Sequence, residues 1–247
     1  MKKISAVIIT YNAEKHLAKV LERLKDIASE IIIVDSGSTD QTMIIAKKFK
    51  SRIFKQKWLG YARQKNFGLD RAKNDWILSL DADEVVDDEL AESIKKADPK
   101  HFNGYYIAFK NYFDVEWVRY GGWYPDWHLR LFNKNMMRFQ IKEVHEQIKP
   151  IGNIGYLKGN ILHYTYNSNK HYFQKIEKYT ALDAEYLFGK GRKWTMFYQI
   201  GKPIKEFFQM YFSKKGFMDG FLGLKIALYS AIYRYKVAEK LHKLYKT

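Results

Sequence analysis

Residues 76–84 read WILSLDADE. A short apolar run, interrupted only by Ser79, is typical of a buried strand. The three acidic residues that follow mark its end, because carboxylates are unfavourable in an apolar core. In α/β sheets, ligands collect beyond the carboxyl ends of strands. From there Asp81 and Asp83 could both reach one Mg²⁺ or Mn²⁺ ion, since hard divalent cations prefer oxygen ligands. Taken alone, the same residues also fit an acidic turn that caps the next helix.

Strands and helices alternate on the N-terminal side of this stretch. Three short segments have the pattern of β-strands: Ile4–Thr10, Glu30–Val34 and Arg52–Lys55. A helix is expected after each; in the first, Leu17 and Leu21 belong to an apolar face with helical spacing. Repeated strand–helix alternation predicts an α/β fold, with a mostly parallel, doubly wound sheet and right-handed crossovers.

Composition narrows the class of protein. A chain of 247 residues can bury one full core, or a main domain with an appendage. Hydrophobic residues make up 47%, which excludes disorder, and the absence of cysteine excludes disulfides and thiolate zinc sites. The N-terminus becomes polar after about eight residues, too early for a signal peptide. No apolar run approaches the ~18 residues of a membrane-spanning helix. We therefore expect a cytoplasmic protein.

Charge is distributed unevenly along the chain. Residues 1–150 contain 26 Lys and Arg against 21 Asp and Glu, whereas residues 151–247 contain 17 against 6. The N-terminal part thus has an ordinary globular surface, and the C-terminal part is basic as well as aromatic. Such a segment suggests an anionic partner: an acidic membrane, an anionic glycolipid or a nucleic acid.

The loops after successive parallel strands meet at one edge of the sheet. There they would gather residues 10–14, 35–40 and 81–84, with Arg63 and Lys65 nearby. No phosphate-binding G-x-x-x-x-G-K-[ST] loop occurs, and no G-x-G-x-x-G follows the first strand. The residues at this edge therefore include carboxylates that could bind a metal, a carboxylate that could bind a base or ribose, and cations that could bind phosphate. This inventory suits a nucleotide diphosphate bound through a divalent ion.

Four motifs in order carry a specific resemblance. ISAVIITYNAEKHL, EIIIVDSGSTDQT, the ARQKNFGL helix and WILSLDADE together resemble the family 2 glycosyltransferases of the GT-A fold. The resemblance implies an inverting transfer of a sugar from a nucleotide sugar, often a UDP-sugar, with a divalent metal (Mg²⁺ or Mn²⁺) as cofactor. Further along, GGWYPDWHLRLF, VHE and a later LHY look like the subgroup that adds glucose to the inner core of lipopolysaccharide.

The resemblance also implies a donor site. Its nucleotide-sugar side comprises Thr10, Tyr11, Asn12, Glu14, Asp35, Ser36, Gly37, Arg63, Lys65, Asp81 and Ala82. The first loop and Asp35 would hold base and ribose, and Arg63 would contact phosphate. Alternatively, Asp35 belongs to a helix-capping turn, and Arg63 lies on a solvated helix face. Asp81 and Asp83 would form the metal-binding DxD motif. His163 either completes the metal site, as in some related enzymes, or is structural.

The acceptor side departs from the commonest family pattern. The Glu-Asp pair that many members carry at the start of the acceptor-side helix is absent. A carboxylate must still take the proton of the attacking hydroxyl. Glu146 is the first candidate for this base and Asp126 the second; each could instead bind the acceptor or form a salt bridge. Acceptor-binding candidates are Trp123, Tyr124, Arg130 and His145. Arg130 could also pair with phosphate or Glu146, or lie on the sheet surface without a functional role.

The remainder of the chain reads as helical. We expect a helix from Asn169 toward Leu187, a second over Trp194–Phe212 interrupted at Gly201-Lys202-Pro203, and a third over Gly220–Lys246. The third helix carries a stripe of apolar residues, among them Phe221 and Ile232, with lysines distributed around it. This pattern favours a membrane-surface element, although packing on the catalytic domain or on a second subunit would also explain it.

The sequence thus predicts a GT-A catalytic domain over residues 1–167 and a basic, aromatic helical extension over residues 168–247. The expected function is metal-dependent, inverting transfer of a hexose, glucose from UDP-glucose, to a glycolipid such as heptose of the lipopolysaccharide inner core. The expected location is the inner face of the cytoplasmic membrane, and a homo-oligomer is compatible with the sequence. The alternatives are a polyprenyl-phosphate or peptide acceptor, or a basic nucleic-acid-binding protein without catalysis. No nucleic-acid-binding motif supports the last.

Overall fold

The computed structural model describes residues 3–141, 147–166 and 168–246, which form two compact units. Unit 1 comprises residues 1–109 and 127–163, and unit 2 comprises residues 110–126 and 164–247. Through unit 1 and into unit 2 the elements are β1 (Ile4–Thr10), α1 (Glu14–Leu24), β2 (Glu30–Asp35), α2 (Thr42–Lys48), β3 (Arg52–Lys55), α3 (Tyr61–Arg71), β4 (Trp76–Asp81), β5 (Glu84–Val86), α4 (Asp88–Lys96), β6 (Gly104–Phe113), β7 (Glu116–Trp117), β8 (Asp126–Asn133), β9 (Phe139–Gln140), β10 (Gln147–Ile148) and β11 (Ile154–Tyr166). The C-terminal elements are α5 (Asn169–Gly189), α6 (Lys202–Phe208) and α7 (Gly220–Leu244), with π-helical turns η1 (Phe197–Gly201) and η2 (Gln209–Ser213) and a 3₁₀ turn η3 (Gly216–Asp219).

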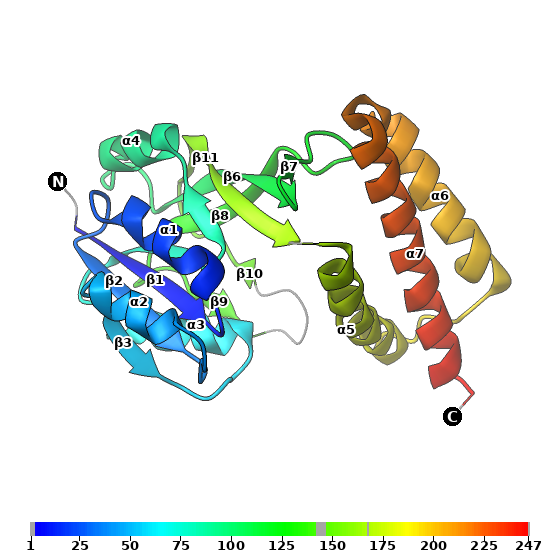
Figure 1. Cartoon of the computed structure of the whole chain (residues 1–247), viewed down its shortest axis with the longest axis horizontal. Coiled ribbons are helices and arrows are strands. Elements are labelled where there is room, and N and C mark those ends of the chain that lie inside the picture. Colours follow the sequence, from blue (N-terminus) through cyan, green and yellow to red (C-terminus); the bar gives the residue numbers. More distant parts are fainter. Residues whose placement is uncertain (1–2, 142–146, 167, 247) are drawn as a thin grey trace. The chain divides into compact units, whose positions relative to one another are not determined.

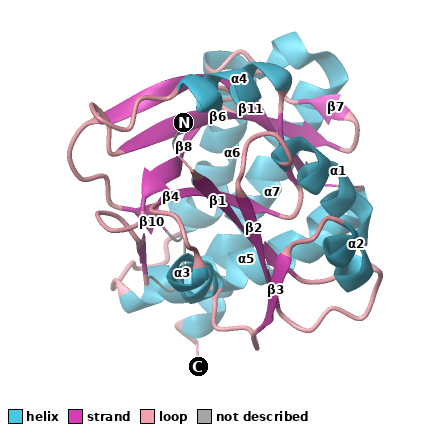
Figure 2. Ribbon diagram, turned by 90° about the vertical axis from the view of Figure 1, so that its left-hand side faces the viewer, coloured by secondary structure: helices cyan, strands magenta, loops and turns pink. Residues whose placement is uncertain are grey.

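The main sheet has the strand order β3-β2-β1-β4-β8-β6-β11-β5, with β7 paired to β6. The first four strands in this order are parallel, and β8 pairs antiparallel with β4. Helices flank the parallel strands: α3 lies on one side of β1 and β2, and α1 and α2 lie on the other (Figure 2). The predicted α/β fold, a sheet flanked by helices with a helical C-terminal extension, is confirmed.

The core of unit 1 follows the alternation of the strands. Val7, Ile32 and Ile77 belong to one buried cluster, which the α3 residue Leu69 joins. Close approach of α3 requires Gly68, because a Cβ there would lie 2.4 Å from the Val7 Cγ1 atom. Helix α3 therefore sits directly on the parallel strands, and its N-terminal residues are brought to the end of the sheet where β2 finishes.

The C-terminal helices form most of unit 2. Helix α7 lies between α5 and α6 (Figure 1). Its buried residues are Leu222, Gly223, Ile226, Ala227, Val237, Ala238 and Leu241. A cluster of aromatic rings supports this packing, with Tyr172 of α5 stacked on Tyr229 of α7 at 4.5 Å between centroids. Unit 2 thus has a core of its own. Among the described residues, no helix combines the length and apolarity that crossing a bilayer requires.

The expected interruption at Gly201-Lys202-Pro203 is wrong. The chain is helical without a break from η1 through α6 to η2. A proline inside an α-helix lacks one hydrogen-bond donor and clashes with the carbonyl four residues earlier. Here Pro203 directly follows the wider π-helical turn η1, which gives its ring room.

An ion-pair cluster joins α5 to α7 within unit 2. The Glu177 carboxylate accepts a hydrogen bond from Lys236, and Lys240 lies 2.8 Å from it. These lysines lower the pKa of Glu177 to about 2, from an ordinary value of 4.5. Because the pKa is lower in the folded state, the stabilisation is complete above pH 4.5 and is lost as the pH falls from 4.5 toward 2.

We expect Glu177→Gln to lower the free energy of unfolding at pH 7 by no more than about 1 kcal/mol, because the carboxylate is half-exposed. The difference from wild type should shrink as the pH falls below 4.5. Urea denaturation at pH 7 and pH 3 measures this effect. Glu185→Gln, an exposed position on the same helix, is the control and should change nothing. A difference that grows in acid would contradict this assignment.

Candidate active site

The register of the parallel strands places three polar residues side by side. Thr10 of β1 pairs with Asp35 of β2, and the neighbouring residue of β1, Ile9, pairs with Asp81 of β4. The carboxyl ends of β1, β2 and β4 therefore finish together at one edge of the sheet. This is the edge at which the sequence predicts the donor site.

The Asp35 carboxylate organises the loop after β2. It accepts hydrogen bonds from the hydroxyls of Thr10 (2.9 Å) and Ser38 (2.5 Å) and from the backbone N–H groups of Gly37 (3.0 Å) and Ser38 (2.9 Å). Gly37 supports this turn with a positive φ of 97°, a conformation that glycine adopts at low cost. Asp35 is 1% exposed, so it shapes the loop from within.

The loops after β1 and β2 are tied to each other. The side-chain Oδ1 atom of Asn12 accepts a hydrogen bond from the Thr39 N–H (2.8 Å), and the Glu14 carboxylate accepts one from the Gln41 N–H (3.0 Å). In the opposite direction, the Glu14 N–H donates to Asp40 (3.1 Å). Tyr11 is left with 64% of its surface exposed. The two loops form one fixed platform, and the exposed ring on it suits stacking on a nucleotide base.

The start of α3 is fixed to the same platform. The fully buried Gln64 donates from Nε2 to the Ser36 hydroxyl (3.0 Å) and to the Gln56 carbonyl (3.1 Å). Its neighbour Arg63 is exposed on the first turn of α3. The chain thus holds the backbone around Arg63 while the guanidinium faces solvent, an arrangement that suits a phosphate contact.

Lys65 is one of the most buried side chains, although lysine is normally exposed. It is 1% exposed, and its ammonium lies 3.0 Å from the Asp81 carboxylate. Burial would raise the pKa of Asp81, but Lys65 and then Arg130, whose guanidinium is 3.7 Å away, hold that pKa below its ordinary value. Asp81 is therefore ionised and already paired with two cations of the chain.

A second buried pair lies beside the first. The Glu84 carboxylate, 1% exposed, accepts a hydrogen bond from Arg130 (2.7 Å) and another from the Asp81 N–H (2.9 Å). Burial raises the pKa of Glu84 to about 8, while Arg130 opposes the rise. Arg130, a predicted acceptor-binding residue, is thus engaged with Glu84. Lys65, Asp81, Glu84 and Arg130 form a quartet of ionisable groups beneath the end of β4.

Asp83 and His163 adjoin this quartet, because His163 of β11 pairs with Glu84 of β5 in the sheet. The His163 Nε2 atom lies 3.9 Å from the Asp83 carboxylate, and both side chains are partly exposed. No hydrogen-bond donor of the described residues contacts Asp83, whereas the Phe109 ring supports His163 edge-on at 5.9 Å. Across the described ranges, no three His, Cys, Asp or Glu side chains form one metal-binding group. Of the three predicted metal ligands, Asp83 and His163 lie next to each other, whereas Asp81 is paired with Lys65.

The predicted acceptor-side residues fall in different places. Asp126 accepts a hydrogen bond from Asn111 (3.2 Å) in unit 2. Trp123 packs on the aromatic cluster of unit 2, and Tyr124 meets Trp117 edge-on at 5.3 Å. Glu146 and His145 lie outside the described residues. A cavity of about 440 Å³ in unit 2 is lined by Glu116, Trp117, Arg119, Tyr120, Met218, Asp219 and Leu222.

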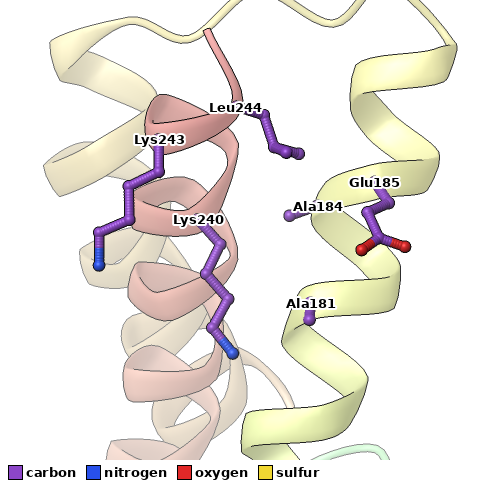
Figure 3. Close-up of a pocket in the computed structure, with 6 residues that line it drawn as sticks. All are labelled: Ala181, Ala184, Glu185, Lys240, Lys243 and Leu244. Atoms are coloured by element: carbon purple, nitrogen blue, oxygen red, sulfur yellow. The ribbon is translucent and has the colours of Figure 1, made fainter. Parts of the chain in front are cut away.

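A smaller cavity of about 200 Å³ lies between α5 and α7 (Figure 3). Its lining residues are Ala181, Ala184, Glu185, Lys240, Lys243 and Leu244. Lys240 is engaged by Glu177 and Thr180, and ligand sites commonly need about 300 Å³ or more. This cavity therefore does not suit a nucleotide sugar.

Sequence reasoning missed two features of the site. Gln64 was not singled out, although its amide connects α3 to the loop after β2. The pairing of Arg130 with Glu84 was not foreseen, since 46 residues separate the two. The only local signal was Glu84 itself, a carboxylate next to two apolar residues of a short strand, which requires a cation when buried.

Comparison with known proteins identifies related sequences. A profile described as "Glycosyl transferase family 2" matches residues 5–161. An uncharacterized glycosyltransferase of Rickettsia typhi is 31% identical over 260 residues, covering 99% of this chain and 88% of the relative. The lipopolysaccharide core biosynthesis glycosyltransferase LpsC of Rhizobium meliloti is 31% identical over 254 residues, covering 97% and 92%.

Two solved structures share the fold. The mannosyltransferase PcManGT from Pyrobaculum calidifontis, in complex with GDP-Man and Mn²⁺, aligns with a TM-score of 0.54 at 12% identity, over 97% of this chain and 87% of that one. Staphylococcus aureus TarS 1–349 in complex with UDP aligns with a TM-score of 0.51 at 15% identity, over 98% and 91%. At these identities the likeness concerns the fold. From the family profile and the full-length relatives it follows that this chain is a glycosyltransferase of family 2.

Proposed function

We propose that this enzyme transfers a hexose, with inversion, from a UDP-sugar to a glycolipid acceptor, with glucose from UDP-glucose as the expected donor. The observation that carries the proposal is the common edge of β1, β2 and β4. There, a fixed platform with the exposed Tyr11 lies at the strand ends next to the DxD stretch. This arrangement offers a surface for a base, a cation for phosphate and the partly exposed carboxylate of Asp83.

Donor binding rests on groups that the chain leaves available. The exposed Tyr11 ring would stack on uracil, and the Arg63 guanidinium would pair with the diphosphate. Asp35 and Gln64 act indirectly, because their polar atoms hold the loop in place. The complex of TarS with UDP supports a uridine nucleotide.

A divalent cation fits Asp83 and His163. Among the described residues, no donor hydrogen-bonds to the Asp83 oxygen atoms, and the Nε2 atom of His163 lies 3.9 Å from one of them. These two residues would hold Mg²⁺ or Mn²⁺ together with the donor diphosphate, whereas Asp81 would position the turn through Lys65. When bound, such an ion neutralises negative charge on the leaving diphosphate. The Mn²⁺ complex of PcManGT supports this choice of ion.

The reaction needs one base from the chain. As the acceptor oxygen bonds to the anomeric carbon, the bond from that carbon to the diphosphate oxygen breaks, and the hydroxyl proton passes to a carboxylate. Glu146 is the first candidate for that carboxylate, and Asp126 is the second. Trp123, Tyr124 and His145 remain candidates for binding the acceptor.

We expect Glu146→Gln to lower kcat at least about 100-fold, because the amide cannot take the proton. UDP binding should stay within about twofold of wild type, which corresponds to less than 0.5 kcal/mol. Sugar transfer and calorimetry measure the two effects. Asp126→Asn is the matched variant; if it abolishes kcat while Glu146→Gln does not, the base is Asp126.

The name of one relative supports a class of acceptor. LpsC is named for lipopolysaccharide core biosynthesis, which supports a lipopolysaccharide core acceptor such as an inner-core heptose. Such an acceptor is held in a membrane, so the enzyme would work at the inner face of the cytoplasmic membrane. A homo-oligomer would be compatible with this role.

Calorimetry with UDP, with and without Mn²⁺, is the experiment that tests the proposed function. Metal-dependent binding of UDP, followed by transfer from UDP-glucose to core glycolipid, is the expected result. Binding of GDP, CMP or dTDP in place of UDP would overturn the donor. Transfer to a polyprenyl phosphate or peptide, but not to core glycolipid, would overturn the acceptor.

A further inference from the structure

The outer face of the helix from η1 to η2 carries a row of exposed apolar side chains. We call Phe197, Ile200, Ile204, Phe208 and Phe212 the apolar stripe. Their exposed fractions are 69, 50, 53, 55 and 53%. They follow one another at steps of three or four residues, the spacing of one helix face. The rings of Phe208 and Phe212 are stacked at 5.6 Å, which confirms that they share this face.

A second exposed apolar group follows at once in the chain. Phe217 and Met218 of η3 and Phe221 at the start of α7 are 49, 53 and 82% exposed. The Phe217 ring lies 6.3 Å from Tyr211, so this group adjoins the end of the helix that carries the apolar stripe. So much contiguous apolar surface on a soluble unit marks an interaction site.

The charges around this surface have one sign. Between Arg192 and Phe221 the chain has six cationic residues: Arg192, Lys193, Lys202, Lys205, Lys214 and Lys215. Its two carboxylates are both engaged. Glu206 pairs with Arg234 at 3.1 Å, and Asp219 accepts the backbone N–H groups of Arg119 (2.9 Å) and Tyr120 (2.8 Å). The surface therefore presents apolar groups and cations together.

The combination of apolar and cationic side chains indicates which kind of partner fits this surface. A nucleic acid would satisfy the cations and leave the phenylalanines in water, and a second copy would bring the same cations face to face. An anionic bilayer satisfies both, because apolar side chains enter the boundary of the acyl chains while lysines contact lipid phosphates. We propose that the apolar stripe and the Phe217–Phe221 group insert into the surface of an anionic membrane. The inference deepens the proposed action on a membrane glycolipid.

Vesicle flotation tests this proposal with a matched pair of double variants. Ile204→Glu/Lys205→Glu changes the apolar stripe and its flank on α6; Ile44→Glu/Lys48→Glu makes the same change on α2. Ile204 and Ile44 are 53 and 50% exposed, so neither change disturbs a core. On phosphatidylcholine vesicles with phosphatidylglycerol, we expect the α6 variant to bind at least about tenfold more weakly than wild type. The α2 variant should bind like wild type.

Three results would overturn the proposal. The first is that both variants lose vesicle binding equally. The second is that the wild type binds equally well to vesicles of pure phosphatidylcholine. The third is that the wild type binds no vesicles but self-associates, and that the α6 variant abolishes this self-association. UDP binding, measured by calorimetry on the same proteins, separates this proposal from the proposed function. Vesicle binding without UDP binding leaves the membrane surface standing and refutes the donor site.

Discussion

Asp83→Asn should lower the rate of sugar transfer by about 1,000-fold, since metal stabilisation of a leaving diphosphate contributes several kcal/mol. Asparagine keeps the size of the side chain and removes its charge. The thermal midpoint should stay unchanged, because no described residue donates a hydrogen bond to the Asp83 carboxylate. What should disappear is the part of UDP binding that depends on Mn²⁺.

Calorimetry of UDP with and without Mn²⁺ measures this loss directly, and a thermal melt confirms that the fold is intact. Asp26→Asn is the matched control, because this exposed aspartate follows α1 and should leave binding and turnover unchanged. His163→Ala should reproduce the loss of metal-dependent binding in part. If Asp83→Asn binds UDP as wild type does in Mn²⁺, the metal is not held by Asp83.

Lys65→Met should be the most destabilising of the substitutions considered. Methionine fills the space of the buried lysine stem but leaves Asp81 without its nearest cation, 3.0 Å away. Removing one partner of a buried ion pair costs roughly 3–5 kcal/mol, and we expect about 3 kcal/mol because Asp81 is partly exposed and Arg130 remains 3.7 Å away. Urea denaturation gives the free energy of unfolding.

A double variant separates charge from packing. Lys65→Met/Asp81→Asn removes both charges of the pair and should recover most of the stability lost in the single variant, since neutral replacement of a buried pair is often tolerated. Lys48→Met, on the exposed face of α2, should stay within about 0.5 kcal/mol of wild type. A single Lys65→Met variant as stable as Lys48→Met would show that the ion pair contributes nothing.

The pattern along the chain was enough to predict the architecture of the sheet. β-branched runs alternate with helical periodicity over residues 4–81, and both signals are local, because each depends on neighbours a few positions away. The same locality explains why Tyr11, Asp35 and Asp81 could be placed at one edge: parallel strands joined by helices must finish at the same end. The sequence by itself therefore determined the class of fold and the edge of the sheet at which these polar strand ends meet.

The roles within that site depended on the tertiary structure. The carboxylates of the DADE stretch look alike in the sequence, yet Asp81 faces Lys65, Glu84 faces Arg130 and Asp83 lies beside His163. Similarly, the exposed face of the helix through Pro203 appeared only once that helix proved unbroken.

These outcomes share one physical reason. The pairing partners lie between 16 and 80 residues apart and meet only through strand order and register. Burial, which decides whether a carboxylate is paired or available, depends on every element packed around it. Local periodicity encodes which face of an element is apolar, and only the assembled sheet decides which charges meet at its end.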